Sequence, residues 1–264
     1  RRRRASAGRA TNPDGSSIVG PFIVRVLNQS GATAQLLMSR NTPAYPAATL
    51  DTSKATLISA ISETTEGDKS GVVKIPSADW AFASCESTPF PGRPDPTHIC
   101  LKTGFDPTRL YELQYTVKDP LVMGVGFAAT RDLNSFFRYE KADAAGTPNP
   151  VAGMVRWGIS EGSSQSGAFL RAYIRLGFNQ DEAGRIVWEG SNPNIASRVI
   201  DLNRRFASPG TDVELYGLGN EAPLWWEDWN DAPRGRGTSG ILDRCRASNT
   251  CPKILETFGA AEIW

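Results

Sequence analysis

The chain has 264 residues, of which 40% are hydrophobic and 22% are charged, and its formal net charge at pH 7 is +1. This length suffices for one large domain or two small ones, and the near-neutral charge argues against binding nucleic acid through bulk electrostatics. No apolar run approaches the roughly 20 residues of a membrane-spanning helix. We therefore expect neither a nucleic-acid partner nor a membrane partner.

The chain begins with a basic segment. Residues 1–4 are all arginine and lie in an Ala-, Gly- and Ser-rich context without aromatic residues. This composition is typical of a disordered end. We assign residues 1–11 to a disordered basic end and residues 12–264 to a single domain.

The section from about residue 20 to residue 100 is predicted to be rich in β-structure. Short apolar strands are expected at residues 22–27, 34–38 and 72–75, separated by Gly, Pro and Ser. Repeated prolines between residues 89 and 96 predict a rigid, irregular segment.

Four cysteines fall into two local pairs, Cys85 with Cys100 and Cys245 with Cys251. Each pair brackets a short polar loop, and the chain has one histidine, so no second His is available for a zinc site beside them. Two disulfides are favoured over four free thiols. Because disulfides persist in oxidising compartments, we expect a secreted or periplasmic protein.

The middle of the chain predicts a strand, a helix, a strand and a helix in that order. Residues 110–117 alternate as a strand, and residues 119–137 begin with Asp-Pro and continue with helical spacing. Residues 154–159 alternate again, and residues 169–178 have helical spacing. This order is typical of a parallel sheet covered by helices.

The turn between the second strand and the second helix reads Gly162-x-Ser164-x-Ser166-Gly167, a relaxed form of the G-x-S-x-G nucleophile elbow. A strand that turns directly into a helix strains the central residue, so its neighbours two positions away must be small. We predict Ser164 as the nucleophile, Ser166 as the fallback, and the N–H of Gln165 as an oxyanion donor. The alternative is a Ser/Gly-rich loop without a catalytic role.

The last section, from residue 179 to the end, predicts a short strand at residues 185–190 and a strand-like run at residues 251–258. Between them lies a cluster of tryptophans that includes Trp225 and Trp226. Such rings can stack on a sugar or an aromatic acyl group. We take Trp225 and Trp226 as candidate substrate-binding residues, with core packing under a long loop as the alternative.

Three long runs, residues 104–139, 162–190 and 251–264, resemble the alpha/beta hydrolase domain family of bacterial serine hydrolases and carboxylesterases. The similarity covers about residues 12–264. It implies an α/β-hydrolase fold, with a mostly parallel sheet, helices on both faces and a β-rich N-terminal section. It also implies an acyl-enzyme mechanism with Ser164 at the nucleophile position, which needs neither a metal nor an organic cofactor.

The remaining members of a catalytic triad are harder to place. In this fold the acid and then the histidine follow the nucleophile, so Glu262 is the candidate acid. The only histidine, His98, precedes Ser164 and lies beside Cys100, where a structural role is favoured. Proteins resembling this one extend beyond both ends of the sequence. We therefore expect the domain to be incomplete at both ends and the base histidine to lie on a further segment.

Three functions remain open from the sequence. The first is a serine hydrolase that acts on small-molecule carboxylic esters through Ser164, with further segments of the same protein completing the site. The second is a catalytically inactive α/β-hydrolase-like binding or structural module. The third, a carbohydrate-binding domain, rests on the tryptophans and the β-rich section alone. We favour the first, because a decayed site would have no reason to keep a well-formed elbow.

Overall fold

The structure, a computed structural model, divides the chain into two compact units. Unit 1 comprises Arg1–Met123 and Leu202–Thr211, and unit 2 comprises Gly124–Asp201 and Asp212–Trp264. Within the part of the chain that is described, no helix is long and apolar enough to cross a membrane. The described residues are 8–26, 32–39, 42–64, 67–196, 206, 225–232, 235 and 237–260.

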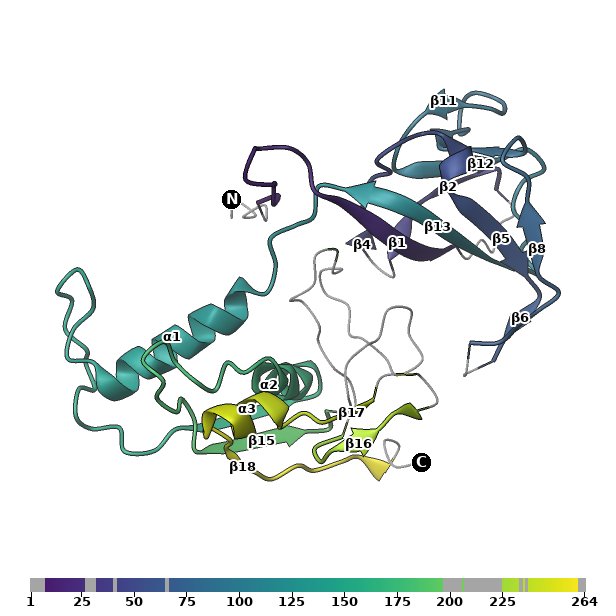
Figure 1. Cartoon of the computed structure of the whole chain (residues 1–264). Helices are drawn as coiled ribbons and strands as arrows, with labels where there is room; N and C mark the ends of the chain where they lie inside the picture. The colour runs from purple at the N-terminus through teal and green to yellow at the C-terminus, as the bar shows by residue number, and fades with distance from the viewer. Residues whose placement is uncertain are drawn as a thin grey trace. The chain divides into compact units, whose positions relative to one another are not determined.

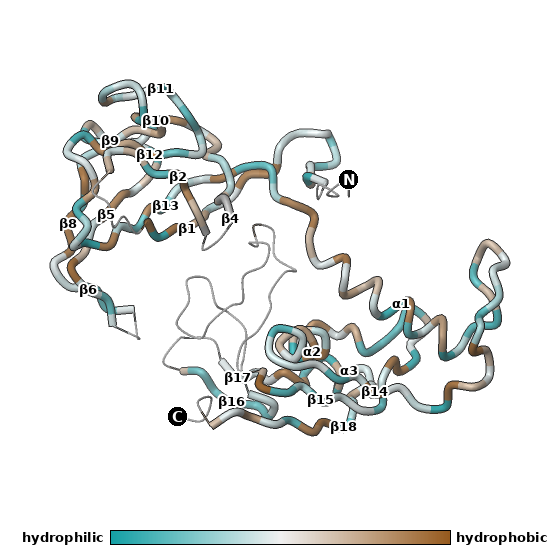
Figure 2. The backbone as a smooth tube through the Cα atoms, turned by 180° about the vertical axis from the view of Figure 1, so that it is seen from behind, coloured by the Kyte–Doolittle hydropathy of each residue, from teal (hydrophilic) through white to brown (hydrophobic). Residues whose placement is uncertain are grey.

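The larger sheet of unit 1 has four antiparallel strands in the order β1-β13-β5-β8. In β13, Leu113 and Val117 are fully buried whereas Gln114 between them is exposed. Tyr111 and Tyr115 are also buried, so every second residue from 111 to 117 lies in the core. Figure 2 shows the strand as a mixture of hydrophobic and hydrophilic residues. This period of two is expected where one face of an antiparallel sheet is covered. The strands are β1 (Val19–Val26), β5 (Thr56–Ala60), β8 (Val73–Ile75) and β13 (Leu110–Lys118).

A second antiparallel sheet of unit 1 has the order β2-β12-β9 and shares one hydrophobic core with the first. Its strands are β2 (Ala34–Leu36), β9 (Trp80–Ala81) and β12 (His98–Leu101). Leu57 and Leu113 from the larger sheet and Ile99 from the smaller one are completely buried in this core. Each such side chain contributes about 1.5–3 kcal/mol of hydrophobic stabilisation.

Short elements complete unit 1. Three separate two-stranded antiparallel pairs, β3-β4, β6-β7 and β10-β11, accompany the two sheets. The 3₁₀-helix η1 begins after Asp51, whose side chain accepts a hydrogen bond from the N–H of Ser53. The elements are β3 (Met38–Ser39), β4 (Thr42–Pro43), η1 (Thr52–Lys54), β6 (Ser62–Glu63), β7 (Lys69–Ser70), β10 (Ala83–Ser84) and β11 (Arg93–Pro94).

Unit 2 contains a three-stranded parallel sheet in the order β14-β15-β18. Helix α2 packs against β14 and β15, and α3 packs against α2, so both helices lie on the same side of the sheet (Figure 1). The strands are β14 (Ile159–Ser163), β15 (Gly190–Asn194) and β18 (Lys253–Ile254), with β16 (Trp229–Asn230) and β17 (Thr238–Ser239) forming a separate antiparallel pair. The helices are α1 (Val125–Tyr139), α2 (Gln165–Arg175) and α3 (Asp243–Ser248).

Aromatic side chains form the contact between α1 and α2. Phe127 of α1 stacks on Phe169 of α2 with ring centroids 4.6 Å apart, and on Phe178 at 5.4 Å. Tyr173 of α2 stacks on Trp188 at 4.4 Å. Burial raises the pKa of the Tyr173 phenol above its usual value, so this ring stays neutral. These contacts hold α2 firmly in place against its neighbours.

The predicted α/β-hydrolase fold class is wrong. The described residues form seven sheets, of which six are antiparallel and one is a small parallel sheet, with three α-helices. The strand predicted at residues 110–117 is β13, but it pairs antiparallel with β1 and β5 rather than joining β14. Helices were also expected on both faces of the sheet, whereas Ile159 on the face of β14 away from α2 is 75% exposed.

The strand predicted at residues 185–190 also lies elsewhere. Residues 180 and 186 form an isolated antiparallel bridge at the base of a turn, and strand β15 begins only at Gly190. The turn is closed by Asp181, which accepts hydrogen bonds from the backbone N–H groups of Ala183 and Arg185 at 3.0 and 2.7 Å. The carboxylate therefore competes with strand formation at this point.

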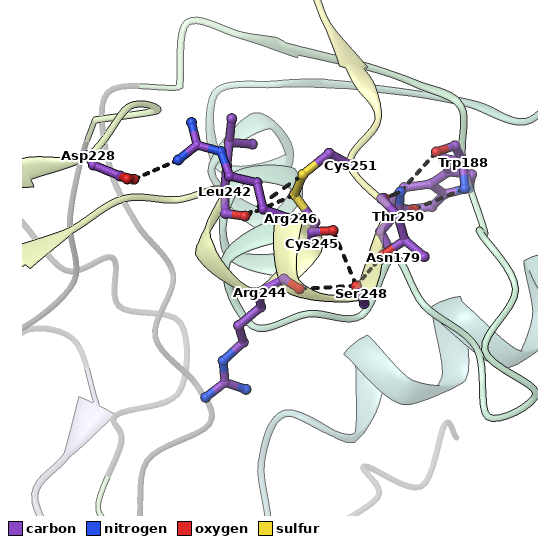
Figure 3. Close-up of a disulfide and its surroundings, with 10 residues drawn as sticks. All are labelled: Asn179, Trp188, Asp228, Leu242, Arg244, Cys245, Arg246, Ser248, Thr250 and Cys251. Atoms are coloured by element: carbon purple, nitrogen blue, oxygen red, sulfur yellow. Dashed lines mark hydrogen bonds and ion pairs between the residues drawn. A yellow bond between two sulfur atoms is a disulfide. The ribbon is translucent and has the colours of Figure 1, made fainter.

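Both predicted disulfides, Cys85–Cys100 and Cys245–Cys251, are present. The second joins α3 to the segment that precedes β18 (Figure 3). Beside it, the carbonyl of Thr250 accepts a 2.7 Å hydrogen bond from the side-chain amide of Asn179 (Figure 3). The disulfide thus lies where α3, β18 and the turn after α2 meet.

Candidate active site at the carboxyl edge of the parallel sheet

Ser164 is the one residue between β14, which ends at Ser163, and α2, which begins at Gln165. Its backbone has φ 55° and ψ −120°. Residues other than glycine rarely adopt such angles, because this backbone conformation costs about 1–3 kcal/mol of free energy. Ser164 is also exposed. A strand, a strained serine and a helix in immediate succession form the context that the nucleophile-elbow pattern requires.

Two glycines leave room for this turn. A Cβ added at Gly162 would lie 2.6 Å from the carbonyl oxygen of Ser166, and one at Gly167 would lie 2.8 Å from the carbonyl oxygen of Asn194. Both obstacles are backbone atoms, which cannot move away without distorting the turn. The small residues around Ser164 are therefore a steric necessity of this geometry.

Backbone hydrogen bonds fix the strained residue on both sides. The N–H of Ser164 donates to the carbonyl oxygen of Asn194 at 2.9 Å, and its own carbonyl accepts from the N–H of Ala168 at 2.9 Å. Strained conformations persist when their surroundings determine them in this way. The conformation of Ser164 is thus held by the end of β15 and by the first turn of α2.

The two candidate serines differ in what their hydroxyl groups do. The hydroxyl of Ser166 donates to the carbonyl oxygen of Ser163 at 2.8 Å and accepts a hydrogen bond from the backbone N–H of Ser163 at 2.9 Å. Across the residues that the structure covers, the hydroxyl of Ser164 has no hydrogen-bond partner. Ser166 therefore closes the turn, and Ser164 is the serine whose hydroxyl is available for chemistry.

The start of α2 offers donors for a negative charge. The first intrahelical bond comes from the N–H of Ala168, which leaves the N–H groups of Gln165 and the next two residues without partners in the described structure. Free N–H groups and the helix dipole favour an anion at this position. The N–H of Gln165 thus lies at the position expected for an oxyanion donor, and this role stays a prediction.

Asn194, the last residue of β15, connects the elbow to the segment after β18. Its side-chain amide donates to the hydroxyl of Ser163 at 3.1 Å, and its side-chain oxygen accepts from the hydroxyl of Thr257. The N–H of Ile195 donates to the carbonyl oxygen of Thr257 at 2.7 Å. Three parallel segments therefore meet at their carboxyl ends, the edge at which parallel sheets bind ligands.

A buried ion pair anchors the segment after β18 to α2. Arg171 and Glu256 lie 2.9 Å apart, with side chains only 4% and 6% exposed. The indole N–H of Trp226 donates to the other carboxylate oxygen of Glu256, and the Arg171 guanidinium lies 5.2 Å from the centre of the Trp226 ring. Removal of one charge from such a pair would leave the other buried and uncompensated. The cluster thus fixes Thr257 near the elbow.

The other predicted site residues are placed as follows. Trp226 belongs to the Glu256 cluster, and the indole N–H of Trp225 donates to the carbonyl oxygen of Ser239 at 2.5 Å. Both indole N–H groups are therefore used within unit 2, and a role in substrate binding stays a prediction. Glu262, the predicted acid, lies outside the described residues.

His98 lies on β12 in unit 1, and its ring is held by its neighbours. Its Nδ1 lies 3.0 Å from a carboxylate oxygen of Asp95 and 3.0 Å from the hydroxyl of Thr97. The side chain is 20% exposed. These contacts within four consecutive residues fit the structural role expected for this histidine.

A cavity of about 520 Å³ lies at the opposite end of β14 from Ser164. Its walls are mostly apolar and include Trp157, Ile159 and Trp188. The charged lining residue Arg138 is already paired with Glu189. The cavity is thus separate from the elbow. No group of three or more His, Cys, Asp or Glu side chains suited to a metal ion occurs in the described ranges.

The hydrogen-bonding residues at the sheet edge, Asn194 and Thr257, were not predicted from the sequence. No sequence motif marks either residue. Their proximity to Ser164 arises from the parallel register of β14, β15 and the segment after β18. Comparisons with protein-family models, with curated proteins and with solved structures find no match to this chain. The geometry of the elbow therefore carries the functional inference.

Proposed function

We propose that the protein is a serine hydrolase that acts on small-molecule carboxylic esters through an acyl-enzyme on Ser164. The observation that supports this function is the strained backbone of Ser164, with φ 55° and ψ −120°, at a strand-to-helix turn that leaves its hydroxyl free. A connecting loop gains nothing from such strain, whereas a nucleophile elbow uses it to lift the hydroxyl out of the turn.

The reaction would proceed by acyl transfer. The Ser164 hydroxyl attacks the ester carbonyl carbon while a general base takes its proton, and the resulting oxyanion accepts a hydrogen bond from the N–H of Gln165. Collapse of this intermediate breaks the ester C–O bond, and the proton passes to the departing alcohol. Water then releases the acid by the same steps. We assign the base to a histidine on a further segment of the same protein.

The compartment follows from the disulfides. Cys85–Cys100 and Cys245–Cys251 fit a protein that folds under oxidising conditions. Secretion or export to the periplasm accounts for both bonds, and it is part of the proposal.

Hydrolysis of p-nitrophenyl butyrate, followed on the millisecond timescale, tests this function. An acyl-enzyme predicts an initial burst of p-nitrophenol of about one equivalent, which Ser164→Ala abolishes and Ser166→Ala retains. Added imidazole, as a surrogate base, is expected to accelerate the burst only in chains that keep Ser164. A turnover rate that is unchanged in Ser164→Ala would contradict the proposal and favour a binding or structural module.

A further inference from the structure

We infer that Asn194 is a positioning residue that holds Ser164 in its strained conformation, an inference that rests on the proposed function. Asn194 has hydrogen bonds to three different residues around the elbow. Its backbone carbonyl accepts from Ser164, its side-chain amide donates to Ser163, and its side-chain oxygen accepts from Thr257. The described structure gives no other residue this set of contacts at the carboxyl edge of the sheet.

Asparagine suits this position because its side chain donates and accepts at the same time. The amide N–H groups serve the hydroxyl of Ser163, and the amide oxygen serves the hydroxyl of Thr257. Aspartate would lack the donor, and an apolar side chain would lack both groups. Residue 194 therefore needs a side chain that carries both a hydrogen-bond donor and an acceptor, a requirement that a surface residue does not have.

A second strained residue follows Asn194 directly. Ile195 has φ 44°, a value that is a true outlier for a β-branched side chain. Its N–H is held by the carbonyl oxygen of Thr257 at 2.7 Å. Asn194 thus lies between two strained residues, because its carbonyl oxygen accepts from the N–H of Ser164 and Ile195 follows it in the chain. Thr257 bonds to the side chain of Asn194 and to the backbone of Ile195.

The consequence for catalysis concerns the hydroxyl of Ser164. Positional errors of about 1 Å at a reacting atom reduce rates by roughly 100-fold. With the side-chain bonds of Asn194 removed, Ser163 and Thr257 lose a shared partner, and the turn gains freedom while its backbone bond to residue 194 remains. The reaction step of Ser164 should therefore slow, while the initial binding of a small reagent is unaffected.

The strand offers a matched control in Asn192. It lies two residues before Asn194, on the same face of β15, opposite Glu161 of β14. Its side-chain oxygen is buried without a hydrogen-bond partner among the described residues. Truncation of Asn192 therefore removes the same chemical group from the same strand, without removing a bond to the elbow.

The test is the kinetics of inactivation by a small fluorophosphonate, resolved into the initial binding constant and the maximal inactivation rate. Asn194→Ala and Asn194→Asp should lower the maximal rate by about 10-fold or more with unchanged binding, and Asn192→Ala should stay within about twofold of wild type. Thr257→Val should slow the reaction, and Thr257→Ser should restore it, because only the hydroxyl bonds to Asn194.

Each outcome decides the inference. Because Thr257 is exposed, its variants should fold even if Asn194→Ala does not, and thermal unfolding of every variant checks this. A reactive wild type whose rate is unaffected by both Asn194→Ala and Thr257→Val overturns the role of Asn194 alone. A wild type that does not react at all, when tested as the natural protein, overturns the proposed function and the role of Asn194 with it.

Discussion

Gly162 lies directly against the carbonyl group of Ser166, so close that a Cβ at residue 162 would be 2.6 Å from the oxygen and 2.7 Å from the carbon. This contact arises because the chain passes from an extended strand to a helix within one residue. The same turn sets the strained backbone of Ser164. The absence of a side chain at Gly162 and the exposure of the Ser164 hydroxyl are therefore two consequences of one geometry.

Replacement of Gly162 by alanine should damage both stability and reactivity. We expect the free energy of unfolding to fall by about 1–3 kcal/mol, because backbone must shift to accept the Cβ. Ser164 should then react more slowly with a fluorophosphonate. The control is Gly126→Ala in α1, where nothing lies within 4 Å of the added Cβ. That variant should gain about 0.5–1 kcal/mol, and equal losses in both variants would contradict the steric explanation.

The carboxylate of Asp181 should make the stability of the protein sensitive to acid. Burial raises the pKa of Asp181, but hydrogen bonds from Ser135 and from the backbone and guanidinium of Arg185 outweigh it, so its pKa is below the usual 3.8. A lowered folded-state pKa stabilises the fold above the unfolded-state pKa, and this contribution is lost as the pH falls through the folded-state value.

The variant Asp181→Asn isolates this effect. Denaturant unfolding at pH 7 should show a loss of about 2 kcal/mol relative to wild type, and the difference should shrink at pH 3 and below. Asp132→Asn serves as the control, because Asp132 is 58% exposed in its pair with Arg131 and should change stability by less than about 1 kcal/mol. A difference for Asp181→Asn that grows as the pH falls would reverse the predicted sign.

The two disulfides should differ in their contributions to stability. Cys85–Cys100 closes a loop of sequence separation 15 and Cys245–Cys251 one of separation 6. From chain entropy alone, we expect losses of about 3 and 2 kcal/mol when each pair is replaced by alanines. Thermal and denaturant unfolding of the two double variants measures both values. A larger loss at the shorter loop would mean that contacts around Thr250 outweigh the entropy term.

Local features of this chain were predictable because neighbouring residues determine them. The turn around Ser164 is set by small residues between a strand and a helix, and the structure has β14 ending at Ser163 and α2 starting at Gln165. Both disulfides join cysteines that are near in sequence. The strand predicted at residues 110–117 is β13, which spans Leu110–Lys118.

The fold class could not be predicted because it depends on which distant strands pair. The alternation of apolar and polar residues along a strand does not specify its partner. Strand β13 and strand β14 follow each other along the chain, yet β13 pairs with β1 and β5 while β14 pairs with β15. Asn194 and Thr257 acquire their roles only through that pairing. No short motif therefore indicated their importance at the candidate site. The one available signal was the presence of an asparagine at the carboxyl end of a parallel strand.

The most direct test of the central claim is fluorophosphonate labelling followed by digestion with trypsin and tandem mass spectrometry. Trypsin releases residues 157–171 as one peptide that contains Ser160, Ser163, Ser164 and Ser166. We predict a single modification, on Ser164, that disappears in Ser164→Ala and persists in Ser166→Ala. Modification of another serine, or no labelling of the natural protein, would contradict the assignment of Ser164 as the nucleophile.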